Sequence, residues 1–151
     1  MRRYNGFSNA TNTASPTAPL FAVVGVATTR GRIYDFVVGS DATPADAATK
    51  LAFQRTITSG LGTTALVPPP LDSADPAALL LYFSAWSSTQ PTVAAATSLL
   101  QITMNQRATF RWVAVPDSEL VVPATAANGI ALMSVVASAT ANYGFSTMWQ
   151  E

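Results

Sequence analysis

Residues 50–58 read Lys-Leu-Ala-Phe-Gln-Arg-Thr-Ile-Thr, and this stretch decides the fold class. Leu51, Phe53, Arg55 and Ile57 would share one face of an extended chain, and smaller or polar residues would share the other. A period of two residues over such a length is typical of a β-strand with one packed face. The arginine inside the apolar set is expected near the strand end or beside a carboxylate.

Similar β-rich segments recur along the chain, separated by proline, glycine and asparagine. They are residues 20–28, 31–38, 63–67, 79–87, 97–104, 108–115, 119–122, 129–137 and 143–149. This spacing predicts an all-β fold, an antiparallel, jelly-roll-like β-sandwich of about eight to ten short strands. A distorted barrel and a short helix over 74–81 are the alternatives.

Three connections between these segments are short enough for β-hairpins. They lie at Arg30-Gly31, at residues 105–107 and near Ala141-Asn142, so we expect the flanking segments to pair. Asn128-Gly129 is a further strong turn signal. We expect one domain over 19–151, preceded by an extended N-terminal arm over 1–18 that has little apolar periodicity.

The segment 79–87 has large apolar residues on both faces. Leu79, Leu81 and Phe83 would lie on one side, and Leu80, Tyr82 and Trp86 on the other. A strand of this kind is buried on both sides or covered by a partner.

The composition excludes several classes of function. The 151 residues include no cysteine and no histidine, which removes disulfides, thiolate sites and the usual catalytic triads. Only 11% of residues are charged and the net charge is zero, so long-range attraction to nucleic acid or to a membrane is not expected. No apolar run is long enough to span a bilayer. We therefore expect a non-enzymatic protein, made in the cytoplasm, without metal or cofactor.

The carboxylates are explained best by structural roles. Asp41 with Asp46, and Asp72 with Asp75, fall in turn-like segments that suit capping and turns more than catalysis. Asp35 lies inside an apolar strand, where a pairing with Arg55 or Arg111 would satisfy it.

Two arginines stand out in a chain with so few charges. Phe110, Trp112 and Ala114 alternate with Arg111, so the aromatic residues are expected to face the core and the arginine to face away. Arg107 would share the arginine face, about 13 Å from Arg111 by strand rise. Such residues are typical of ion pairs within a sheet or of contacts between subunits.

The candidate partner-binding residues combine this pair with the expected arm. They are Arg2, Arg3, Tyr4, Phe7, Arg107 and Arg111. The abundant Ala, Thr, Ser and Val favour burial against neighbouring subunits.

Residues 31–56, GRIYDFVVGSDATPADAATKLAFQRT, and residues 104–132, MNQRATFRWVAVPDSELVVPATAANGIAL, resemble a family of small tailed-phage virion proteins found in cyanophages. The resemblance covers roughly residues 30–135 and includes no catalytic signature. It implies a head decoration, or cement, protein on the outer capsid surface. Its partners would be the major capsid protein and further copies of itself, often as a trimer.

The alternative is a phage tail or fibre protein, or a receptor-binding module that recognises carbohydrate. A carbohydrate site would use exposed aromatic side chains, for which Trp86, Tyr143 and Trp149 are the candidates.

Overall fold

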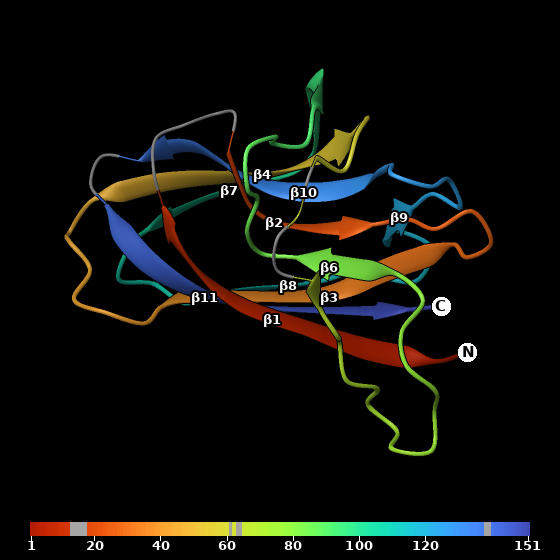
Figure 1. Ribbon diagram of the computed structural model, residues 1–151. Helices are drawn as coiled ribbons and strands as arrows, with labels where there is room; N and C mark the ends of the chain where they lie inside the picture. Colours follow the sequence, from red (N-terminus) through yellow and green to blue (C-terminus); the bar gives the residue numbers. More distant parts are fainter. Residues whose placement is uncertain (13–17, 61, 63–64, 138–139) are drawn as a thin grey trace.

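The computed structural model describes residues 1–12, 18–60, 62, 65–137 and 140–151, and these contain strands and no helix (Figure 1). The helix considered over 74–81 is therefore absent from the described chain. The strands are β1 (Arg3–Asn12), β2 (Pro19–Val24), β3 (Gly31–Ser40), β4 (Ala48–Thr56), β5 (Ala65–Leu66), β6 (Leu81–Phe83), β7 (Val93–Asn105), β8 (Phe110–Val113), β9 (Leu120–Val122), β10 (Gly129–Ala137) and β11 (Ala141–Gln150).

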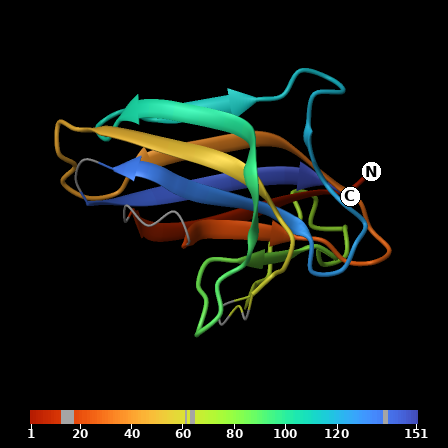
Figure 2. The same cartoon turned by 90° about the horizontal axis from the view of Figure 1, so that it is seen from above.

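The strands form two antiparallel sheets packed face to face (Figures 1 and 2). Sheet A has the order β1-β11-β3-β8, with β9 also pairing with β3, and sheet B has the order β5-β6-β2-β10-β4-β7. Two interleaved four-stranded sheets, β1-β11-β3-β8 and β2-β10-β4-β7, have the strand order of a jelly roll. The predicted antiparallel β-sandwich of jelly-roll type is confirmed.

The three predicted hairpins are wrong. β2 and β3, β7 and β8, and β10 and β11 do not pair with each other, because each connection carries the chain from one sheet to the other. Stacked sheets lie only about 10 Å apart, so a short loop can cross between them as readily as it can close a hairpin.

The expected N-terminal arm is largely part of the sandwich. Residues 3–12 form β1, which pairs with β11 in unbroken register from Arg3 opposite Gln150 to Asn12 opposite Ala141. Gly6 permits close packing here, since a Cβ at this position would meet the rings of Tyr82 and Trp149. Residues 13–17 of the expected arm lie outside the described residues.

Aromatic side chains fill the space between the sheets. Phe21 of β2 lies 6.0 Å from Phe36 of β3, 5.2 Å from Tyr82 of β6 and 5.5 Å from Phe145 of β11, measured between ring centroids. Because these residues come from both sheets, Phe21 is the centre of the inter-sheet core.

The alternation predicted in 50–58 is present in β4, where Leu51 and Phe53 are buried as expected. The pairing of β4 with β10 runs without a shift from Ala52 to Thr56 and sets Arg55 opposite the buried Ile130, so Arg55 lies on the same face as Phe53. Arg55 is exposed because it lies next to the end of the strand, as expected, and its Nη1 donates to the carbonyl of Val121 at 3.2 Å. Ile57 lies beyond β4 and is exposed.

The segment 79–87 forms a shorter strand than predicted. Leu80 and Tyr82 are buried inside the sandwich, whereas Leu79 and Leu81 are exposed. Trp86 lies beyond β6 and packs on the outside of sheet B. The second apolar face is therefore partly open.

Candidate interaction surface

Among the described residues, no group of three or more histidine, cysteine, aspartate or glutamate side chains is placed to hold a metal ion. None of the described segments is a helix long and apolar enough to cross a membrane.

Arg111 forms an ion pair with Asp35, as the sequence suggested. Its Nε donates to Oδ1 at 3.1 Å and its Nη2 donates to Oδ2 at 2.6 Å, which is a bidentate arrangement. The Asp35 side chain is 6% exposed and the Arg111 side chain is 63% exposed, so the guanidinium covers the carboxylate from the solvent side. Hydrogen bonding to Asp35 raises the pKa of Arg111 further above its already high value.

The predicted orientation of β8 is confirmed. Phe110 and Trp112 pack against the core, and Arg111 lies on the opposite face. Arg107 departs from the prediction because it lies in the turn after β7 and not on the strand. Its Nη1 is 3.9 Å from Asp46 and its Nε donates to the carbonyl of Pro44 at 3.4 Å.

The four candidate residues near the N-terminus have different environments. Arg2 lies 3.8 Å from Asp75, and the guanidinium of Arg3 lies 5.8 Å from the ring centroid of Tyr34. Phe7 is 59% exposed. Tyr4 is buried, packs on Trp149 and donates its hydroxyl hydrogen to the carbonyl of Pro76, so its selection as a partner-binding residue was wrong.

The outer face of sheet A is a broad surface formed by hydrogen-bonded strands. Antiparallel register aligns side chains in rows across its strands, and no described strand lies over it. Its charged groups include two ion pairs, Arg111 with Asp35 and Arg32 with Glu119 at 3.8 Å, and Arg3, whose guanidinium lies over the ring of Tyr34. Two rows across the middle of the face are Phe7, Ser146, Val37 and Arg111, and Asn5, Met148, Asp35 and Val113.

The outer face of sheet B is covered in part by the chain itself. Ala22, Val24, Ala131 and Met133 form a second apolar cluster there, and Phe83, Trp86 and Val93 pack on it. The indole of Trp86 donates to the carbonyl of Ser59 at 3.1 Å, which ties this cover to the segment after β4.

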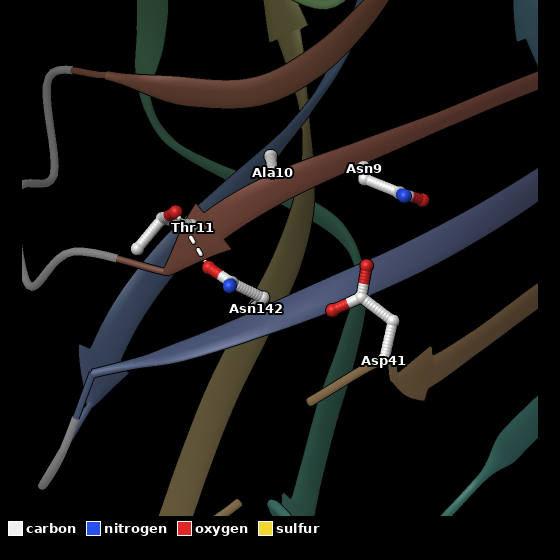
Figure 3. Close-up of a pocket in the computed structure, with 5 residues that line it drawn as sticks. All are labelled: Asn9, Ala10, Thr11, Asp41 and Asn142. Atoms are coloured by element: carbon white, nitrogen blue, oxygen red, sulfur yellow. Dashed lines mark hydrogen bonds between the residues drawn. The ribbon is translucent and has the colours of Figure 1, made fainter. Parts of the chain in front are cut away.

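A hollow of about 270 Å3 opens beside the end of β1 (Figure 3). The hydroxyl of Thr11 donates to Oδ1 of Asn142 at 2.7 Å. The carboxylate of Asp41 also lines the hollow, and none of the lining residues is aromatic. Sequence reasoning missed these residues because only the β1–β11 register brings Thr11 and Asn142 together. The hollow is lined by Asn9, Ala10, Thr11, Asp41 and Asn142.

The aromatic residues considered for carbohydrate binding are unsuited to it. Tyr143 and Trp149 are completely buried in the core, and Trp86 serves as the cover of sheet B. These positions were therefore wrong as candidates for an exposed sugar platform.

Comparison of the chain with models of protein families, with curated proteins and with solved structures gives no match. The class that the geometry defines is a jelly-roll sandwich with one uncovered outer face. Because one fold hosts many functions, a functional conclusion has to rest on that face.

Proposed function

We propose that this chain is a non-enzymatic virion structural protein, a head decoration protein that binds the major capsid protein and stabilises the outer surface of the shell. The observation that carries the proposal is the outer face of sheet A. It consists of hydrogen-bonded strands, it carries the Arg111–Asp35 ion pair, and it includes the exposed apolar side chains of Phe7 and Val113.

A surface formed by a sheet is rigid, which favours a long-lived contact with a partner protein. Backbone positions in a sheet are held by neighbouring strands, so little conformational entropy is lost when a partner docks. The exposed apolar groups supply a favourable transfer free energy on burial, about 25 cal/mol per Å2 of apolar surface.

The mechanism follows from mass action. A protein that binds the assembled shell but not its dissociated subunits stabilises the assembled state. Several weak contacts act together when the chain binds as an oligomer, and the trimer implied by the resemblance would gain in this way.

The test uses shells assembled from the major capsid protein of the same phage genome. We expect the chain to co-sediment with these shells to a fixed occupancy and to raise their thermal transition. Val37→Lys places an unpaired charge in the middle of the sheet A face and should weaken binding about tenfold, which corresponds to about 1.4 kcal/mol.

Thr103→Lys is the matched control, because Thr103 is exposed on β7 of sheet B. Equal binding of both variants would show that sheet A does not dock on the shell. Failure of the unmodified chain to sediment with shells, together with binding to tails or to a glycan array, would overturn the proposal in favour of the tail or receptor-binding alternative.

A further inference from the structure

We infer that the free edge of β1 joins a second copy of this chain, by antiparallel pairing of residues 7–11 about a two-fold axis. This contact is separate from any threefold contact, and it does not depend on the proposed function.

The backbone geometry of β1 shows which groups face outward. The amide of Arg2 donates to the carbonyl of Glu151 at 3.2 Å and the amide of Glu151 donates back to Arg2 at 2.9 Å, so even-numbered residues of this strand bond to β11. In an antiparallel pair, alternate residues direct both N–H and C=O to the other side. The odd-numbered residues therefore present these groups at the free edge.

The chain's own backbone shows that this edge accepts a strand. The amide of Asn5 donates to the carbonyl of Pro69 at 3.2 Å, and the amide of Leu71 donates to the carbonyl of Arg3 at 2.8 Å. Residues 69–71 thus occupy the first part of the edge in antiparallel orientation, with Tyr4 opposite Pro70.

The described residues leave the second part of the edge without a backbone partner. Past Asn5, no backbone hydrogen bond from the described residues reaches the outward groups of Phe7, Asn9 and Thr11. Leu66, three residues before Pro69, pairs with Tyr82 in sheet B. A hollow of about 280 Å3 remains beside the open part, lined by Phe7, Ser8, Asn9, Leu66 and Ser84.

The open part lacks the protections that sheet edges usually carry. Residues 7–11 read Phe-Ser-Asn-Ala-Thr and contain no charge and no proline. Lysine, proline and bulges are the common devices that keep an edge strand from pairing, and the register with β11 contains no bulge here.

A second copy fits this segment better than a charged or longer strand. Residues 69–71 block the edge on one side, which leaves a short stretch that is symmetric about Asn9. Two-fold pairing sets Phe7 of one copy opposite Thr11 of the other and Asn9 opposite Asn9. Identical uncharged strands meet without like-charge repulsion, and the exposed ring of Phe7 is covered in both copies.

The first experiment measures self-association of the full chain by sedimentation equilibrium over a concentration series. Asn9→Pro removes an outward N–H in each copy while leaving every bond to β11 in place, since a proline is tolerated where the N–H faces solvent. We expect it to raise the dimer dissociation constant about tenfold or more.

The matched control is Val113→Pro on the opposite edge of sheet A. Ala114 donates to the carbonyl of Tyr34 at 2.8 Å, so the amide of Val113 also faces outward, and Val113 is 55% exposed. This variant should leave the dissociation constant unchanged. Equal effects of the two prolines, or an unmodified chain that stays monomeric or forms trimers insensitive to Asn9→Pro, would refute the inference.

Cross-linking provides a second readout that does not require a proline. The chain has no cysteine, so Asn9→Cys introduces a single thiol. Facing residues of a hydrogen-bonded antiparallel pair have Cα atoms about 5.5 Å apart, within the range for a disulfide. We expect Asn9→Cys to form a covalent dimer under mild oxidation much faster than Val113→Cys, and similar rates for both would contradict the two-fold contact.

Discussion

The outer faces of the two sheets differ in what covers them. On sheet B, Phe83 of β6 and Trp86 pack against the outer apolar cluster that includes Ala22 and Met133. On sheet A no described segment does the same, although Phe7 and Val113 expose apolar side chains there. One face is therefore covered in part by side chains of the same chain, and the other is not covered by any described segment.

The largest expected change in stability comes from removing a side chain that packs between the two sheets. Phe21→Ala removes a fully buried ring that lies against Phe36, Tyr82 and Phe145, so it creates a cavity between the sheets. We expect a loss of about 3–5 kcal/mol in the free energy of unfolding, measured by urea denaturation. A loss below about 1 kcal/mol would mean that the two sheets are held together elsewhere.

The second prediction concerns Trp86, which packs on the outer apolar cluster of sheet B. Trp86→Ala uncovers the cluster that includes Val24 and Ala131, and it removes the indole that bonds to Ser59. Because Trp86 is only partly buried, we expect a smaller cost of about 2–3 kcal/mol. Leu81→Ala is the control, since Leu81 is exposed on the same sheet, and an equal cost for both variants would argue against Trp86 as a cover.

A smaller effect is expected from the ion pair on sheet A. Arg111→Ala leaves the buried Asp35 carboxylate without its bidentate partner. We expect a cost of about 1–3 kcal/mol by chemical denaturation. Arg107→Ala breaks an exposed pair with Asp46 and should change stability by less than about 0.5 kcal/mol. The reverse order would contradict a structural role for the Arg111 pair.

The smallest effect near neutral pH concerns a tyrosine between the sheets. Burial raises the pKa of Tyr82 above its ordinary value of about 10. The folded state therefore favours the protonated phenol, and stability that is fully present below about pH 10 declines as the pH rises further.

Tyr82→Phe removes this proton linkage, together with the hydrogen bond between Tyr82 and Ser8 at 3.0 Å. Its Tm should fall less steeply than that of the unmodified chain between about pH 9 and pH 11. Parallel curves in thermal scans would indicate that Tyr82 does not contribute to alkaline unfolding.

The interaction surface was only partly accessible from sequence. The pairing of Asp35 with an arginine and the outward orientation of Arg111 followed from alternation and from the cost of an unpaired buried charge. The free edge of β1 did not follow, because residues 1–18 lack apolar periodicity and the strand is recognised only through its pairing with β11.

By itself, the sequence determined that the chain is a sandwich of antiparallel strands, because a period of two residues is a local property of an extended backbone. It also excluded chemistry that requires histidine or cysteine. Only the tertiary structure decided which strands pair and which faces remain open. Loops such as residues 105–107 are as compatible with a crossing between sheets as with a hairpin. Pairing is decided by hydrogen bonds and packing between residues distant in sequence, which no local pattern contains.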